Sequence, residues 1–268
     1  MTELYGRSKL LIAMIHAPAS PGLPEHPGVQ AALDAVLAEA RLYREAGVEA
    51  ILLENMHDFP CVGEDEQGPE LVAYMTLLAG ALRREVGKDC VLGLQVLFAG
   101  NRNALAVART AGLDFIRAEG WLYAHVSDKG FLDAQAGRVK RYQSEIGAEK
   151  IAIFTDVKKK HASHALTADL SVGEVAGLLQ LHRSDGAIVT GTETARPPAV
   201  EDLRAVREAC DLPLLIGSGL TAENLAEYHP LADAFIVGSS LKEKGRWNAP
   251  PDPRRVGGML DAFARLEQ

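Results

Sequence analysis

The chain has 268 residues, and its 28 lysines and arginines against 36 aspartates and glutamates give a formal net charge of −8. An acidic chain lacks the clustered positive charge that neutralises a phosphate backbone, so nucleic acid is excluded as a partner. Apolar residues make up 47% of the chain and charged residues 24%, which is typical of a globular protein rather than a disordered, collagen-like or coiled-coil chain.

The longest apolar run, Leu10 to Ile15, is far shorter than the roughly 20 residues of a membrane-spanning helix, so we expect no transmembrane segment. The three cysteines, Cys61, Cys90 and Cys210, are widely spaced and form no C-x-x-C motif. They favour neither a disulfide framework nor a zinc site. These features together predict a cytoplasmic protein.

A short apolar run followed by a helical pattern recurs along the chain. The eight runs cover residues 10–15, 50–53, 91–96, 115–118, 151–154, 187–189, 214–216 and 234–237. Nearly continuous apolar runs are typical of parallel strands whose two faces are both covered. Between the first two runs, Leu33, Val36 and Ala40 share one helical face, and Gly47 is placed as a C-terminal cap.

Eight β-then-α units in one chain of this length predict the α/β class and a single (β/α)8 TIM barrel that covers residues 1–268. A doubly wound parallel sheet has the same local alternation and is the alternative. In a TIM barrel the active site lies at the carboxyl ends of the strands. The polar residues that follow each apolar run are therefore the candidates for function.

Ionisable and amide side chains are dense at the ends of the first, second, fourth and fifth strands. The candidate catalytic residues are His16, Glu54, Asn55, Asp58, Arg117, Glu119, Asp156 and Lys158. A protein that is only a scaffold has no reason to concentrate such groups at one end of a barrel.

Arg117 and Glu119 are two residues apart, so both project to the same face of their strand. They form either a structural ion pair or a site in which Arg117 binds an anion and Glu119 transfers a proton. If Asp156 lies on the neighbouring strand, about 4.8 Å away, it approaches Glu119. One pKa then rises toward neutrality, or a divalent cation such as Mg²⁺ is held between the two carboxylates. The sequence indicates no other cofactor or metal.

A lysine run, residues 158–160, follows Asp156. The run is either a solvated loop or a cationic rim for a phosphate, and in the second case Lys158 is the most inward candidate.

The last two strands end in glycine-serine turns. In this fold, phosphate sites are built from the loops after strands seven and eight and a helix N-terminus, where glycine lets backbone N–H groups approach an anion. Thr221 and Asn224 are expected to open one helix, and Ser239 and Ser240 another. The predicted phosphate-binding residues are Thr190, Gly191, Gly217, Ser218, Gly219, Gly238, Ser239 and Ser240.

Over nearly its whole length the chain resembles the BtpA/SgcQ family of barrel proteins, which are placed among the ribulose-phosphate-binding barrels. The segments that carry this resemblance are 15–18, 54–60, 117–119, 127–130, Asp156 with 160–162, Thr190 and Gly191 with 197–198, 217–220, 237–242, and the tail positions Gly245, Asn248, Asp252, Arg255 and Val256.

This resemblance implies two kinds of function. One is an enzyme that acts on a small phosphorylated sugar or nucleoside-type metabolite as an isomerase, a lyase or an N-glycosidic hydrolase. The other is a non-catalytic photosystem I biogenesis factor, the role that gave the family its name. Barrels of this kind often pair, so a homo-oligomer is compatible with the sequence, although no residue pattern identifies an interface.

Overall fold

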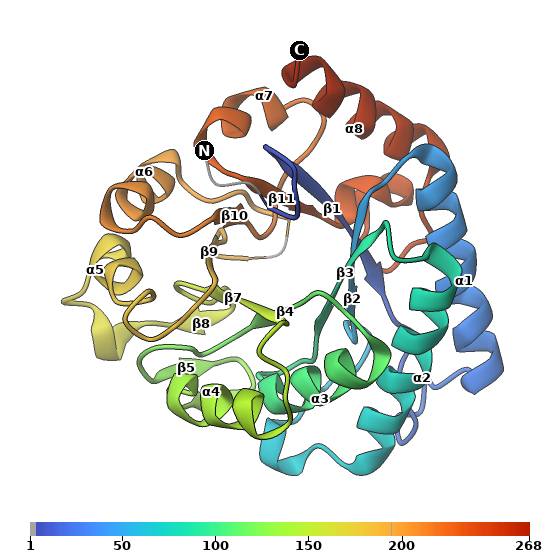
Figure 1. Ribbon diagram of the computed structural model, residues 1–268, viewed down its shortest axis with the longest axis horizontal. Coiled ribbons are helices and arrows are strands. Elements are labelled where there is room, and N and C mark those ends of the chain that lie inside the picture. The colour runs from blue at the N-terminus through green and yellow to red at the C-terminus, as the bar shows by residue number, and fades with distance from the viewer. Residues whose placement is uncertain (1–3, 194) are drawn as a thin grey trace.

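The computed structural model describes residues 4–193 and 195–268, and its eight parallel strands close into one barrel (Figure 1). The barrel strands are β1 (Leu10–His16), β2 (Ala50–Glu54), β3 (Val91–Gln95), β4 (Phe115–Ala118), β7 (Ala152–Asp156), β9 (Gly186–Val189), β10 (Leu214–Ile216) and β11 (Ala234–Val237). Each strand pairs with the next in this order, and β11 pairs with β1. That last pairing confirms the TIM barrel and excludes the doubly wound sheet, which has open edges.

A helix follows each barrel strand along the chain, and the helices lie in a ring outside the strands (Figure 1). Their bounds are α1 (Val29–Ala46), α2 (Pro69–Val86), α3 (Asn101–Ala111), α4 (Ala136–Glu145), α5 (Val172–Gly177), α6 (Val200–Ala209), α7 (Leu225–Tyr228) and α8 (Pro253–Leu266). Gly47 ends α1 in the left-handed conformation at φ 99°, as its position in the sequence predicts.

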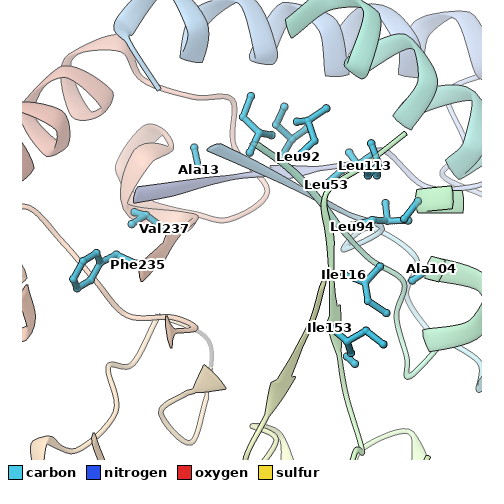
Figure 2. Packing of buried hydrophobic residues seen from close by; sticks show 14 of the residues in the cluster. Ala13, Leu53, Leu92, Leu94, Ala104, Leu113, Ile116, Ile153, Phe235 and Val237 are labelled. Carbon is cyan, nitrogen blue, oxygen red and sulfur yellow. The ribbon is translucent and has the colours of Figure 1, made fainter. Parts of the chain in front are cut away.

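Both faces of the barrel strands are buried, which explains why the strands read as continuous apolar runs. The side chains that point outward pack against the helices, and Figure 2 shows Leu94 and Ile116 on the side of the sheet that faces Ala104 of α3. The alternate side chains, such as Ile12 of β1 and Leu52 of β2, form a separate cluster inside the barrel.

Two phenylalanines fill much of the barrel interior. The ring centroids of Phe115 on β4 and Phe154 on β7 are 5.2 Å apart. Gly93 lies on β3 beside this pair, and a Cβ added at this position would be 2.2 Å from the Cζ of Phe115. Glycine at position 93 therefore provides the space that the Phe115 ring occupies.

A short antiparallel sheet that was not predicted from the sequence is inserted at the carboxyl end of the barrel. It has the order β6 (Gly130–Leu132), β5 (His125–Ser127), β8 (Ala162–Ser163). The first two strands follow β4 and the third follows β7. Strands of two or three residues are too short for a recognisable alternation.

The helices expected after the last two glycine-serine turns are shorter than predicted. Thr221 and Asn224 bond each other reciprocally, since each backbone N–H donates to the side chain of the other, but the following α7 has only four residues. Ser239 opens a single 3-10 turn, η4 (Ser239–Leu241), and α8 begins later at Pro253. Within the described part of the chain, no helix has the length and apolar character needed to cross a membrane.

The contact between Gly93 and Phe115 gives a first prediction. Gly93→Ala should lower the free energy of unfolding by about 1–3 kcal/mol, because the added methyl group overpacks the interior. Combining Gly93→Ala with Phe115→Leu should cost less than the sum of the two single substitutions, because leucine leaves room for the methyl group. Urea denaturation of the unsubstituted protein, the two single variants and the double variant measures the coupling energy between positions 93 and 115. Strictly additive losses in the free energy of unfolding would contradict the contact between Gly93 and Phe115.

Candidate active site

A cavity of about 160 Å³ lies at the carboxyl ends of the barrel strands, a volume on the scale of one small ring compound. Nine of the predicted site residues line it: His16, Glu54, Arg117, Gly217, Ser218, Gly219, Gly238, Ser239 and Ser240. They come from five strands that are far apart in the sequence. Barrel closure therefore brings one predicted acidic group, Glu54, and the two glycine-serine turns to one cavity, whereas Asp58, Glu119 and Asp156 do not line it.

Arg117 forms the central ion pair of the site. Its Nε and one terminal nitrogen donate to the two carboxylate oxygens of Asp156, each at 3.2 Å, and both side chains are almost fully buried. Its other terminal nitrogen donates to the carbonyl oxygen of Gly217 at 3.2 Å. Arg117 thus links β4 to β7 and to the turn after β10. The prediction that β4 and β7 are neighbouring strands is confirmed. Burial raises the pKa of Asp156, and the Arg117 charge opposes that shift.

Glu119 makes a separate ion pair, so of the two alternatives for Arg117 and Glu119 the direct ion pair is not the one formed. Lys159 Nζ lies 3.5 Å from one Glu119 oxygen, and the backbone N–H of Ala99 donates to the other at 2.9 Å. The residues do not fit the predicted divalent cation, because Glu119 and Asp156 are each paired with a cationic side chain of the protein. Among the described residues, no group of three or more histidine, cysteine, aspartate or glutamate side chains is arranged to hold a metal.

Glu54 and Lys160 line the same cavity, and neither side chain has a hydrogen-bond or ion-pair partner among the described residues. Burial raises the pKa of the Glu54 carboxyl, with the Arg117 and Lys160 charges opposing the shift. Burial also lowers the pKa of the Lys160 ammonium, and the Arg117 charge lowers it further. Both groups are therefore shifted toward the neutral form, the condition in which side chains exchange protons readily near neutral pH.

His16 is held as a neutral imidazole. Burial, followed by the Lys242 charge, lowers its pKa to about 3. Its Nδ1 lies 2.9 Å from the carbonyl oxygen of Trp247, so Nδ1 carries the proton and donates, and Nε2 is left as an acceptor. The Trp247 ring also lines the cavity, and its centroid lies 4.9 Å from that of the His57 ring and 6.3 Å from that of the Phe59 ring.

The two glycine-serine turns present free backbone donors. Among the described residues, the N–H groups of Gly219, Ser239 and Ser240 have no acceptor. The serine hydroxyls are partly used, since Ser218 Oγ donates to Arg196 O and Ser240 Oγ donates to Leu220 O. Free N–H groups together with glycine at a cavity wall are the usual elements of an anion site.

Seven predicted site residues lie outside the cavity wall, and besides Glu119, Asp156 and Lys158 they are Asn55, Asp58, Thr190 and Gly191. Asn55 donates to Asp58 at 2.8 Å, and Asp58 accepts from the backbone N–H and the hydroxyl of Ser20. These bonds fix the loop after β1 to the loop after β2. Gly191 packs against the Arg196 backbone, where a Cβ would be only 2.4 Å from the carbonyl oxygen, and Thr190 bonds the carbonyl of Lys158 at 3.5 Å.

The expectation that Lys158 is the most inward lysine is wrong. Its Nζ donates to the carbonyl oxygen of Leu170 at 2.7 Å, away from the main cavity. Lys160 occupies the position in the cavity instead. Trp247 and Arg255 also line the cavity and were not among the predicted site residues. Arg255 and Lys160 belong to segments that carry the family resemblance, whereas Trp247 has no such signal.

By its fold and its cavity, the protein is a TIM barrel with a small cavity at the carboxyl ends of its strands. The chain belongs to the BtpA family, whose sequence model matches residues 7–265. It is 43% identical over its full length to an uncharacterized mitochondrial protein of Caenorhabditis elegans, covering 98% of that protein. It is 32% identical to the photosystem I biogenesis protein BtpA of Synechocystis, over 95% of this chain and 88% of that protein.

Two solved structures with the same fold are distantly related to this chain in sequence. Thiamine phosphate pyrophosphorylase of Pyrococcus furiosus aligns with a TM-score of 0.61 at 13% identity, over 97% of this chain and 98% of that chain. The 3-hexulose-6-phosphate synthase of Salmonella typhimurium aligns with a TM-score of 0.61 at 13% identity, over 96% and 99% of the two chains. These matches support the barrel architecture.

The buried Arg117–Asp156 pair gives a prediction about stability. Arg117→Met should lower the free energy of unfolding by about 3–5 kcal/mol, because it leaves the Asp156 carboxylate buried without a cation. Arg41→Met, which removes an exposed pair with Glu85, should cost less than about 1 kcal/mol. Urea denaturation compares the two variants, and equal losses would show that Asp156 does not need the guanidinium.

The raised pKa of Glu54 gives a prediction about pH. The folded protein holds this proton more tightly than the unfolded chain does, so Glu54 destabilises the fold increasingly as pH rises above the usual glutamate range. Glu54→Gln stays neutral, so its melting temperature should exceed that of the unsubstituted protein by a margin that grows between about pH 5 and pH 8. Glu25→Gln, on the surface, is the control. A margin that shrinks as pH rises would contradict the assignment.

Proposed function

We propose that this protein is an enzyme that acts on a small phosphorylated metabolite bound in the cavity. The observation that carries the proposal is that Gly219, Ser239 and Ser240, whose N–H groups have no acceptor among the described residues, line the same cavity as Glu54 and Lys160. The first set suits an anion, and the second suits proton transfer. An anionic group held at the turns would keep the rest of a small substrate beside the ionisable side chains.

The phosphate is proposed to bind at the Gly217–Gly219 and Gly238–Ser240 turns, with Arg255 as the cationic partner. Arg255 lines the cavity, donates to the carbonyl of Ser240 at 3.4 Å and is partly exposed. A guanidinium adds charge-assisted hydrogen bonds to those of the backbone. Thiamine phosphate pyrophosphorylase and 3-hexulose-6-phosphate synthase, two distant structural relatives, have names that contain phosphorylated compounds, which is in keeping with this proposal.

The reaction that the cavity supports best is proton transfer next to a carbonyl group, as in an isomerase or a carbon–carbon lyase. Such a reaction needs one base and a cationic group that stabilises the developing oxyanion. Glu54 is the proposed base, Arg117 is the cationic group, and the Nε2 atom of His16 accepts a substrate hydroxyl. Glycosidic hydrolysis usually uses two carboxylates, and among the described residues Glu54 is the only carboxylate in the cavity lining.

The name of the Synechocystis relative suggests a second role, a non-catalytic factor in photosystem I biogenesis. Such a role needs neither the free donors of the turns nor an unpaired Glu54. The two roles therefore differ in their response to substitutions inside the cavity, since only the enzyme requires these residues for its activity.

Phosphate-ester binding is tested by thermal denaturation with inorganic phosphate, ribose 5-phosphate and dihydroxyacetone phosphate. We expect these compounds to raise the melting temperature, and unphosphorylated ribose to leave it unchanged. Arg255→Gln should weaken phosphate-ester binding about tenfold, or about 1.4 kcal/mol. Arg254→Gln is the matched control, because the neighbouring Arg254 does not line the cavity. Absence of stabilisation by every phosphate compound would refute the proposal.

A further inference from the structure

Lys160 differs from the neighbouring lysines in how its amine is used. Lys158 Nζ donates to the carbonyl of Leu170, and Lys159 Nζ pairs with Glu119. Lys160 lines the cavity, and no described residue supplies its Nζ with a hydrogen bond or an ion pair. Its amine is therefore the one member of the lysine run that is left available to a ligand in this cavity.

Two of the three acids near Lys160 are paired with other cations. Arg117 holds Asp156 through two hydrogen bonds, and Lys159 holds Glu119. Burial lowers the pKa of the Lys160 ammonium and the Arg117 charge lowers it further, while the Glu54, Asp156 and Glu119 charges oppose the shift. Desolvation at the cavity wall therefore favours the neutral amine.

The anion of the proposed substrate does not need Lys160 either. The donors for a phosphate lie on the turns after β10 and β11 and on Arg255 of α8, whereas Lys160 follows β7. In the order of strands around the barrel, β9 separates β7 from β10. Lys160 is thus placed to meet a different part of a ligand that is anchored by its phosphate.

We propose that Lys160 is a covalent nucleophile that forms an imine with the carbonyl group of a phosphorylated aldehyde or ketone. The inference rests on the proposed function and narrows its substrate class to phosphorylated carbonyl compounds. A lysine that is desolvated and close to another cationic group is the usual form of an amine nucleophile. Glu54 supplies the proton donor and acceptor that imine formation requires.

The step is balanced without an oxidant or a reductant. The lone pair of the neutral Lys160 Nζ forms a bond to the carbonyl carbon, the C=O π electrons move to oxygen, and that oxygen takes one of the two protons of the amine nitrogen. The hydroxyl group of the resulting carbinolamine leaves as water with a proton given by the Glu54 carboxyl. The nitrogen lone pair forms the C=N double bond as the water leaves, and the nitrogen retains its other proton. The protonated imine then withdraws electrons from the adjacent carbon, whose proton or carbon–carbon bond the Glu54 carboxylate helps to break.

The test is trapping of the imine in the intact protein with cyanoborohydride, which reduces an imine to a stable secondary amine. The probes are glycolaldehyde phosphate, glyceraldehyde 3-phosphate and erythrose 4-phosphate, which vary the reach from the phosphate to the carbonyl. Peptide mass mapping then compares Lys160 with every other lysine. We expect an adduct on Lys160 at least about ten times more abundant than on exposed lysines, because a phosphate held at the two turns keeps the carbonyl of the probe beside the Lys160 amine.

Two variants and one control compound make the outcome specific. Lys158→Arg should label as the unsubstituted protein does, and Lys160→Arg, which keeps the positive charge, should lose the selective adduct. Glycolaldehyde without a phosphate should give no preference for Lys160. Equal labelling of all lysines by all three phosphorylated probes would overturn the imine proposal, even if phosphate esters still raise the melting temperature. In that case the phosphate site of the proposed function stands and only the covalent step is wrong.

Discussion

The site depends on the buried guanidinium of Arg117. It binds both carboxylate oxygens of Asp156 and the carbonyl oxygen of Gly217, and so connects two neighbouring strands to the turn that follows β10. A buried ion pair of this geometry contributes little net stability, but removing one partner is costly. Its main effect is on the surrounding groups. It satisfies one barrel acid, opposes the pKa shift of Glu54 and lowers the pKa of Lys160.

The division of charges at the mouth of the barrel follows from this arrangement. The cations Arg117 and Lys159 satisfy Asp156 and Glu119, and buried Lys242 pairs with Glu39 behind the cavity wall. The groups left over are those that face the cavity, where a ligand can reach them. A site of this kind is less stable than an apolar one, a cost that is common where function requires unpaired polar groups.

Much of the architecture could be predicted from the sequence, because burial on both faces makes each barrel strand a continuous apolar run. The turns at Gly217–Gly219 and Gly238–Ser240 were also predictable, since barrel closure determines which strand ends meet. The choice between Lys158 and Lys160 was not, because a loop that turns after a strand has no fixed side-chain period. Trp247 lies in the segment between β11 and α8 and reaches the cavity from there. No local sequence pattern indicates such a contact.

The central claim is that the free backbone donors of the two turns bind the phosphate of a ligand. Amide resonances of the ¹⁵N-labelled protein during a titration with inorganic phosphate test it most directly. The account predicts saturable downfield shifts of the Gly219, Ser239 and Ser240 amides, because each gains an anionic acceptor. Unchanged resonances at these three residues, with saturable shifts confined to another surface of the barrel, would contradict it.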